Sequence, residues 1–240
     1  MLVLQSYRSH DVPAWLEACM ASVREWAQNL GCSYHCADDE ELLGSLPGEF
    51  KSKLDGRWPM LADLGRLKLM QSALAAGESR VLWLDADVLV FAPEKLAVPT
   101  SLRDGYAFGR ELWVDERGRV HHGVHNALCV FDSGNPFLDY YIHACERIVE
   151  QHSGGHWAPQ LLGPKFLKMQ NNLMQFELLD SVAMLSPSVL EDIVRGGGPI
   201  LNKQSDLLGG TFGAANLCSS LIDDASAMQA IEKLREMGNE

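Results

Sequence analysis

The sequence has little positive charge and no long apolar run. Among its 240 residues, 20 Lys and Arg stand against 32 Asp and Glu, which gives a formal net charge of −12. Because binding to nucleic acid or to an anionic membrane needs basic surface, this balance argues against both. No apolar stretch reaches the roughly 20 residues of a membrane-spanning helix, so we expect no transmembrane segment.

The six cysteines show no spacing typical of a metal site. Cys32 and Cys36 flank His35, but no second ligand pair follows at zinc spacing. Buried thiols of a cytosolic protein explain this distribution. The N-terminus lacks a basic segment followed by an apolar one, so we expect no signal peptide and a cytoplasmic location.

Alternating strand and helix patterns occupy the first half of the chain. An apolar run at 2–6, a helical pattern at 13–30 that Gly31 closes, a weak strand at 33–37 and a helical pattern at 59–76 lead to the apolar run 81–91. This β-α-β-α-β order is typical of a parallel sheet covered by helices.

The second half is less regular. We expect a strand pair over 106–119 that turns at 116–118, a strand at 126–131, and amphipathic helices at 136–150 and 225–237. Neither an internal repeat nor an interdomain linker is evident. The sequence therefore predicts one α/β domain that spans residues 1–240.

The run VLWLDADVLVF, residues 81–91, carries two carboxylates, Asp85 and Asp87. Residues two apart on a strand point to the same side, so we expect these side chains to lie together. Two like charges near a buried strand are costly unless a cation offsets them. Mg²⁺ and Mn²⁺ prefer such oxygen ligands, completed by phosphates and water. Asp-x-Asp also occurs at solvated strand ends, but ligands of open α/β sheets gather at the carboxyl ends of strands.

A second charged pair, Asp63 and Arg66, lies in the helical pattern before this strand. Three residues apart, the two side chains share one helix face beside the apolar stripe. They form either an ion pair on the helix surface or part of a cleft beside Asp85, and the spacing by itself leaves both possibilities open.

Both pairs belong to the segment ADLGRLKLMQSALAAGESRVLWLDADVLVF, residues 62–91, which resembles glycosyltransferases of the GT-A fold. It is most similar to their DXD sugar-binding group, which includes bacterial capsular and yeast mannosyl-type transferases and the glucosylating clostridial toxins. The resemblance implies a single Rossmann-like GT-A domain with a mixed, mostly parallel sheet flanked by helices. Residues 1–92 would bind the nucleotide sugar, and residues 93–240 would form the acceptor side.

The resemblance also implies roles for the two charged pairs. Asp87 would ligate Mn²⁺ or Mg²⁺, and Asp85 would contact the donor ribose or sugar and reach the metal through water. Asp63 and Arg66 would hydrogen-bond the donor-sugar hydroxyls or the diphosphate. A guanidinium suits phosphate oxygens and a carboxylate suits a vicinal diol, which agrees with these roles.

Three further residues complete the predicted site. Asn126, in HNALCVF, would contact the sugar or the acceptor, and Lys165, in GPKFL, would be a further donor to the leaving group. Asn216, in AANLCSS, stands where many similar transferases have a histidine, and is the candidate third metal ligand through its amide oxygen.

The predicted reaction is sugar transfer, with retention, from a UDP- or GDP-sugar to a glycan, lipid or protein that the sequence does not identify. One alternative is a phosphohydrolase of the haloacid dehalogenase type, which also uses Asp-x-Asp after a strand, with Asp223 and Asp224 as its late acidic pair. Another is a degenerate transferase that binds a sugar nucleotide without turnover.

Overall fold

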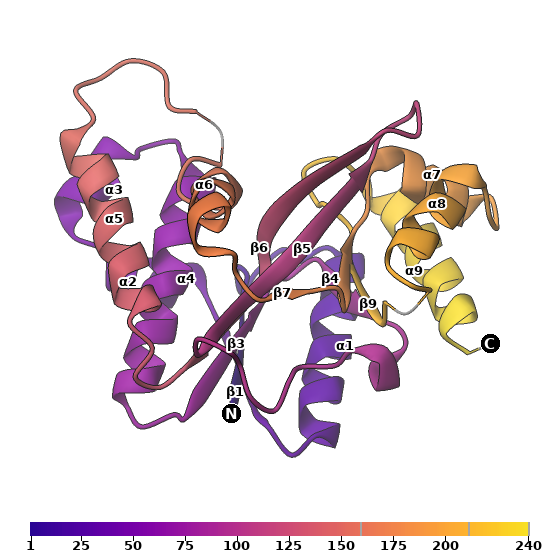
Figure 1. Cartoon of the computed structure of the whole chain (residues 1–240), viewed down its shortest axis with the longest axis horizontal. Coiled ribbons are helices and arrows are strands. Elements are labelled where there is room, and N and C mark those ends of the chain that lie inside the picture. Colours follow the sequence, from indigo (N-terminus) through magenta and orange to yellow (C-terminus); the bar gives the residue numbers. More distant parts are fainter. Residues whose placement is uncertain (159, 211, 240) are drawn as a thin grey trace.

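A six-stranded mixed sheet lies at the centre of the computed structural model, which describes residues 1–158, 160–210 and 212–239 (Figure 1). Its strands, in spatial order, are β2 (Ser33–Ala37), β1 (Leu2–Ser6), β3 (Arg80–Leu84), β6 (Val120–Asp132), β5 (Tyr106–Val114) and β7 (Leu178–Leu179). β2, β1 and β3 are parallel, and β6 is antiparallel to both of its neighbours. The predicted α/β class with a mixed, mostly parallel sheet is confirmed.

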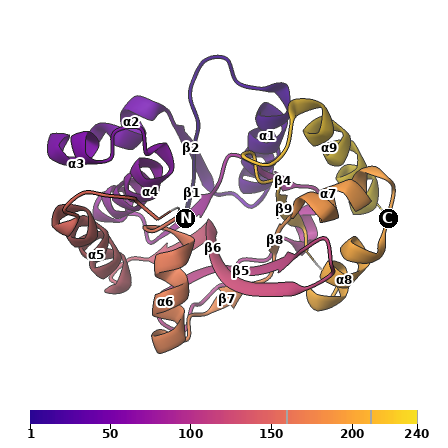
Figure 2. The same cartoon turned by 90° about the horizontal axis from the view of Figure 1, so that it is seen from above.

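Helices cover both faces of this sheet (Figure 2). On one face lie α2 (Asp39–Gly44), α3 (Gly48–Lys53), α4 (Trp58–Ala75) and α5 (Phe137–Gln151), and on the other lies α1 (Ala14–Asn29). Residues of β3 alternate between the two cores: Trp83 packs with the α4 side, whereas Leu82 and Leu84 pack with the α1 side. The strand is apolar throughout because both of its faces are buried.

A smaller sheet extends the molecule beside α1. It contains β4 (Val88–Val90), β9 (Ala214–Asn216) and β8 (Val182–Met184), and is covered by α7 (Pro187–Val194), α8 (Pro199–Leu207) and α9 (Asp224–Gly238) (Figures 1 and 2). A further helix, α6 (Pro164–Met174), lies against β6. Among the described helices, none combines the length and the apolarity needed to cross a bilayer.

The sequence pattern predicted that the apolar run 81–91 is one strand. The structure divides it into two. β3 ends at Leu84, the chain turns at residues 85–87, and β4 begins at Val88 in the smaller sheet. The backbone N–H of Val88 donates to the carbonyl oxygen of Asp85 at 3.0 Å and closes this turn. Asp85 and Asp87 are therefore neighbours at a junction between two sheets, and period-two alternation along one strand does not place them.

The predicted hairpin is also longer than its sequence pattern. β5 and β6 are joined by a turn over 115–119, as expected, but β6 continues through 126–131, which the sequence suggested as a separate strand. The pairing register shifts between Phe108 and Gly109, so the hairpin is irregular beside the site. The predicted strands at 2–6 and 33–37 and the predicted helices at 13–30, 59–76, 136–150 and 225–237 are confirmed to within two residues at each end.

Gly65 lies at the point where α4 packs against α2. A methyl group added there would lie 2.6 Å from the carbonyl oxygen of Leu42, a distance that Cβ contacts in folded proteins essentially never show. Because backbone cannot yield as a side-chain tip does, glycine is required for this close approach of the two helices. The contact fixes α4 at the turn of helix that carries Asp63 and Arg66.

We predict that Gly65→Ala lowers the free energy of unfolding by about 1–3 kcal/mol, the usual cost of overpacking a core. Alanine is also more favourable than glycine in a helix interior by roughly 1 kcal/mol, and the cost of overpacking exceeds this stabilisation. Urea denaturation measures it. Gly44→Ala in α2, where no atom lies within 4 Å of the added methyl group, is the control and should leave stability unchanged or raised. A Gly65→Ala protein as stable as wild type would contradict this packing.

Candidate functional site

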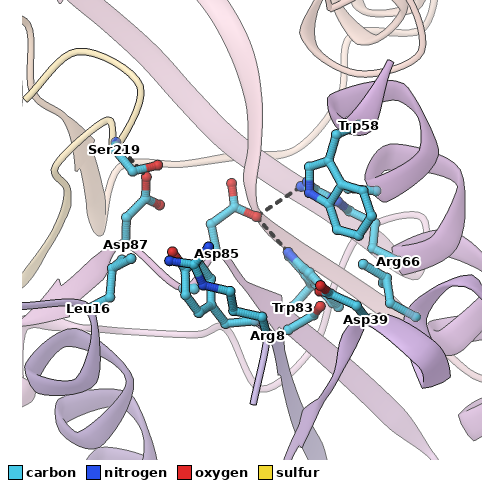
Figure 3. Close-up of a pocket in the computed structure, with 14 residues that line it drawn as sticks. Arg8, Leu16, Asp39, Trp58, Arg66, Trp83, Asp85, Asp87 and Ser219 are labelled. Carbon is cyan, nitrogen blue, oxygen red and sulfur yellow. Dashed lines mark hydrogen bonds and ion pairs between the residues drawn. The ribbon is translucent and has the colours of Figure 1, made fainter. Parts of the chain in front are cut away.

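The turn at residues 85–87 separates two cavities. The first, of about 480 Å³, adjoins the end of β1 and the starts of α2 and α4, and Figure 3 shows its lining. The second, of about 240 Å³, lies on the side of β5, β6 and the segment that follows β9. Arg66, Asp85, Asp87 and Ser219 line both. These four side chains thus form a shared wall.

Arg66 joins the helix to both neighbouring strands. Its Nη1 donates to Oδ1 of Asp85 at 2.9 Å and to the carbonyl oxygen of Asn126 at 3.0 Å, and its Nη2 lies 3.4 Å from Oδ1 of Asp63. The guanidinium also lies over the ring of Trp83, 5.2 Å from its centroid. Asp63 and Arg66 are only 6% and 9% exposed, so the two are a buried pair that faces Asp85 rather than an ion pair on the helix surface.

Burial and neighbouring charges set the protonation of this pair. Burial raises the pKa of Asp63, while Arg66 and a hydrogen bond from Asn126 act in the opposite direction. Burial acts to lower the pKa of Arg66, but the carboxylates of Asp85 and Asp63 raise it overall. The guanidinium therefore stays charged in the protein interior because two carboxylates surround it.

Asp85 uses one of its two carboxylate oxygens to hold its position. Oδ1 accepts from Arg66 and also from Nε1 of Trp83, at 2.7 Å (Figure 3). Within the described part of the chain, Oδ2 accepts no hydrogen bond. Asp85 thus has a fixed orientation and one oxygen open to a ligand.

Asp87 is surrounded by the segment that follows β9. Its Oδ1 accepts from Nδ2 of Asn216 at 2.7 Å, and its Oδ2 accepts from the backbone N–H of Ser219 at 2.8 Å. Cys218 adopts a left-handed backbone conformation, with φ at 54°, which is uncommon for a residue with a side chain. Burial first, and then the charge of Asp85, raise the pKa of Asp87. Asp87 is a desolvated carboxylate that a nearby cation would stabilise.

Asn216 lines the second cavity beside Asp87 and has a fixed amide orientation. Its side-chain oxygen lies 2.7 Å from the backbone nitrogen of Cys218. Because a backbone N–H can only donate, the amide oxygen must point at Cys218 and the amide nitrogen at Asp87. The amide nitrogen of Asn216 therefore orients Asp87, while the amide oxygen keeps a second lone pair, so the metal-ligand role of Asn216 stays a prediction.

Asn126 and Lys165 lie in different surroundings. The side chain of Asn126 donates to Oδ1 of Asp63 at 2.7 Å and lines the second cavity. Lys165 is exposed in the first turn of α6 and lines neither cavity among the described residues. The structure therefore brings Asn126 to the aspartates and leaves Lys165 outside them.

Several residues that line the two cavities were not predicted from the sequence. Arg8 and Trp58 line the first cavity, and Glu111 and Trp113 line the second. Arg8 could have been found, because it follows a predicted strand and the carboxyl ends of parallel strands share one edge of a sheet. No sequence signal marked Glu111 and Trp113 of β5, since a hairpin pattern does not show which face of the hairpin lines a cavity.

The late acidic pair of the phosphohydrolase alternative has structural partners. Asp223 accepts from the backbone N–H of Ser226 at 2.9 Å and caps α9, and Oδ1 of Asp224 accepts from Nε1 of Trp15 at 2.8 Å. Neither residue lines one of the two cavities. Asp223 and Asp224 thus lie outside the cavities that Asp85 and Asp87 line, which does not agree with the role that the phosphohydrolase alternative expects of them.

The donor set also limits how a metal could be held. The described residues contain no group of three or more His, Cys, Asp or Glu side chains arranged to hold a metal ion. Asp85 has one oxygen without a hydrogen bond, and each oxygen of Asp87 accepts one bond and keeps a second lone pair. Two carboxylates suit a Mg²⁺ or Mn²⁺ site that takes its other ligands from substrate phosphates and water.

Comparison with known proteins supports the fold. No protein-family model and no curated protein matches the sequence. A glycosyltransferase involved in the glycosylation of the major capsid of PBCV-1 matches the structure with a TM-score of 0.55 and 10% identity, over 96% of this chain and 98% of that chain. The bifunctional glycosyltransferase WbbM matches with a TM-score of 0.50 and 10% identity, over 96% of this chain but only 49% of its own. The chain has the fold of these glycosyltransferases, and the predicted GT-A fold is confirmed.

His125 of β6 is a buried titratable group beside the site. The residue is 1% exposed and lines the second cavity. Burial lowers its pKa from 6.5 to about 4, so the imidazole is neutral at pH 7. In the unfolded chain the same imidazole binds a proton near pH 6.5.

We predict that His125 makes the protein less stable in mild acid. Its pKa is lower in the folded state than in the unfolded state, so the stabilisation is complete above about pH 6.5 and is lost as the pH falls toward 4. Between pH 7 and pH 4.5 the free energy of unfolding should fall by about 2–3 kcal/mol more in wild type than in His125→Asn. Denaturation at both pH values measures this, with His122→Asn, exposed on the same strand, as the control. Equal losses in wild type and His125→Asn would refute it.

Proposed function

We propose that the protein is a metal-dependent glycosyltransferase that moves a sugar from a UDP- or GDP-sugar to an acceptor. The observation that carries the proposal is the shared wall of Arg66, Asp85 and Asp87 between two adjoining cavities. A transfer between two substrates needs two binding spaces that meet at the reacting bond. The fold shared with solved glycosyltransferases supports the same conclusion.

We assign the first cavity to the donor. Apart from Ser219, every described residue that lines it belongs to residues 1–92, the half expected to bind the nucleotide sugar. Arg8 places a guanidinium there, and Trp58, 45% exposed, offers an aromatic face. A guanidinium suits a diphosphate, and an aromatic ring suits a nucleobase. The second cavity, lined largely by residues beyond 92, is then the acceptor side.

We place a divalent cation, Mn²⁺ or Mg²⁺, at Asp87 and Asp85. When bound, the cation would stabilise the departing diphosphate as a Lewis acid, an effect worth several kcal/mol. Its charge would also offset the burial of Asp87 and the repulsion between the two carboxylates, the two causes that raise the pKa of Asp87. Asn216 and the N–H of Ser219 hold Asp87 in place, and the amide oxygen of Asn216 remains the proposed third ligand.

The other buried groups then have positioning roles. The described hydrogen bonds of Arg66 go to Asp85 and to the carbonyl oxygen of Asn126. We therefore propose that Arg66 orients Asp85 and does not bind the diphosphate directly. Asp63 lines the second cavity beside the shared wall, and Asn126 fixes it through Oδ1, so we propose that Oδ2 accepts from a donor-sugar hydroxyl where the two cavities meet. Retention of the anomeric configuration belongs to the proposal because the transferases that residues 62–91 resemble are retaining.

We predict that purified protein releases a nucleoside diphosphate from one of a panel of UDP-, GDP- and dTDP-sugars, and that the reaction requires Mn²⁺ or Mg²⁺. Asp87→Asn should lower the rate by at least about 100-fold, because removing one carboxylate from a two-carboxylate site weakens the cation that stabilises the leaving group. Coupled detection of the diphosphate measures the rate. Asp55→Asn, at an exposed aspartate that lines neither cavity, is the matched control and should retain full activity.

Two other results would change the assignment. Cleavage of p-nitrophenyl phosphate without cleavage of any nucleotide sugar would favour the phosphohydrolase. A nucleotide sugar that raises the melting temperature only with Mn²⁺, but is never cleaved, would indicate a degenerate transferase that binds without turnover.

A further inference from the structure

Two glycines on the β5–β6 hairpin make room for polar side chains of the opposite strand. Gly109 pairs with His125, and Glu111 pairs with Gly123. A methyl group at Gly109 would lie 1.9 Å from Cε1 of His125, and one at Gly123 would lie 2.1 Å from Oε2 of Glu111. The imidazole and the carboxylate therefore lie across the backbone of the partner strand, where any larger residue would exclude them.

This arrangement forms a recess that faces the aspartates. Residues 109, 111 and 113 share one face of β5, because side chains alternate along a strand. Glu111, Trp113 and His125 all line the second cavity, which Asp85 and Asp87 also line. Glu111 and Trp113 are half-buried, so both reach the cavity while remaining anchored in the sheet. None of the roles assigned above uses this pair.

The charges around the cavity select the kind of molecule that fits. Asp63, Asp85, Asp87 and Glu111 line it, and among the described lining residues Arg66 is the only cation. The guanidinium of Arg66 is already bound to Asp85 and to a backbone carbonyl, so it offers little to an anion. Burial keeps His125 neutral at pH 7. With the proposed cation bound at Asp85 and Asp87, an acidic or phosphorylated acceptor would still meet the carboxylate of Glu111.

A neutral sugar has the opposite properties. Its hydroxyls donate hydrogen bonds that a carboxylate accepts, and its apolar ring face packs on an aromatic side chain, as aromatic rings do with other apolar surfaces. Glu111 supplies the carboxylate and Trp113 the ring, two positions apart on one strand face. Burial raises the pKa of Glu111, so accepting hydroxyl hydrogen bonds would stabilise its ionised form.

We propose that the recess formed by Glu111, Trp113 and His125 is the acceptor subsite and that it takes a neutral sugar. Trp113 packs against the ring, and Glu111 accepts from its hydroxyls, so that one hydroxyl faces Asp85. That oxygen forms a bond to the anomeric carbon of the donor while the bond from this carbon to the diphosphate oxygen breaks. The bonding electrons leave with the diphosphate, which takes the hydroxyl proton. The inference rests on the proposed function.

Acceptor kinetics test this subsite. With the nucleotide sugar that wild type hydrolyses fastest, p-nitrophenyl glucoside, galactoside, mannoside and xyloside are compared with p-nitrophenyl glucuronide. At least one neutral glycoside should accelerate diphosphate release and yield a disaccharide by mass spectrometry, with kcat/KM at least about 10-fold above that of the glucuronide.

Variants identify the residues. Glu111→Gln and Trp113→Ala should each lower kcat/KM for the neutral acceptor by at least about 10-fold, and leave hydrolysis of the donor by water within about 2-fold of wild type. Trp113→Phe should keep most of the acceptor activity. Glu116→Gln, at the exposed tip of the same hairpin, is the matched control and should change neither rate. Melting temperatures show whether each variant is folded.

A binding measurement separates this inference from the proposed function. Saturation-transfer NMR with methyl glycosides uses protein without donor or metal, and should detect a neutral glycoside on wild type but not on Trp113→Ala. If no nucleotide sugar is cleaved but this binding is seen, the proposed function fails and the sugar subsite stands. If a donor is cleaved but no neutral glycoside binds or accelerates release, if the glucuronide is preferred, or if the variants match wild type, the inference is overturned.

Discussion

The site depends on the hydrogen bonds and ion pairs that the buried guanidinium of Arg66 makes. The guanidinium joins α4 to β3 through Asp85 and to β6 through the carbonyl oxygen of Asn126, and lies over Trp83. Removing one partner from a buried charge network typically costs roughly 3–5 kcal/mol, because the remaining charge is left uncompensated. The two halves of the chain therefore meet at a point where a misplaced helix would leave charges unpaired. Gly65, one residue before, lets α4 pack closely against Leu42 of α2.

The second constraint is the placement of two carboxylates at a junction between sheets. Asp85 directly follows the last residue of β3 and Asp87 directly precedes the first residue of β4, so both are oriented by backbone that is fixed on either side. The residues that follow β9 then enclose Asp87 with an amide and a backbone N–H. These donors reduce the cost of burial, but Asp85 still raises the pKa of its neighbour. The structure thus retains an excess of negative charge at the wall between the cavities, which favours a cation there.

The order and type of the main elements could be predicted because each depends on local pattern. Helices at 13–30 and 59–76 follow from apolar periodicity and from terminal Pro and Gly, and the strand before Asp85 follows from an apolar run of strand length. The break of that run into β3 and β4 could not be predicted, since the residues on both sides of the turn are equally apolar and buried although the two strands belong to different sheets. Nor did the local pattern show that residues 126–131 are part of the longer strand β6.

By itself, the sequence determined the α/β class and the candidate pairs Asp63 with Arg66 and Asp85 with Asp87, because these depend on residues that are close along the chain. Only the tertiary structure decided what surrounds them. It turned the Asn216 amide nitrogen toward Asp87, 129 residues away, left Lys165 outside the cavities, and brought Glu111 and Trp113 to the opposite wall. Such orientations depend on contacts between distant segments and on which donor hydrogen-bonds to each oxygen. A local sequence pattern encodes neither.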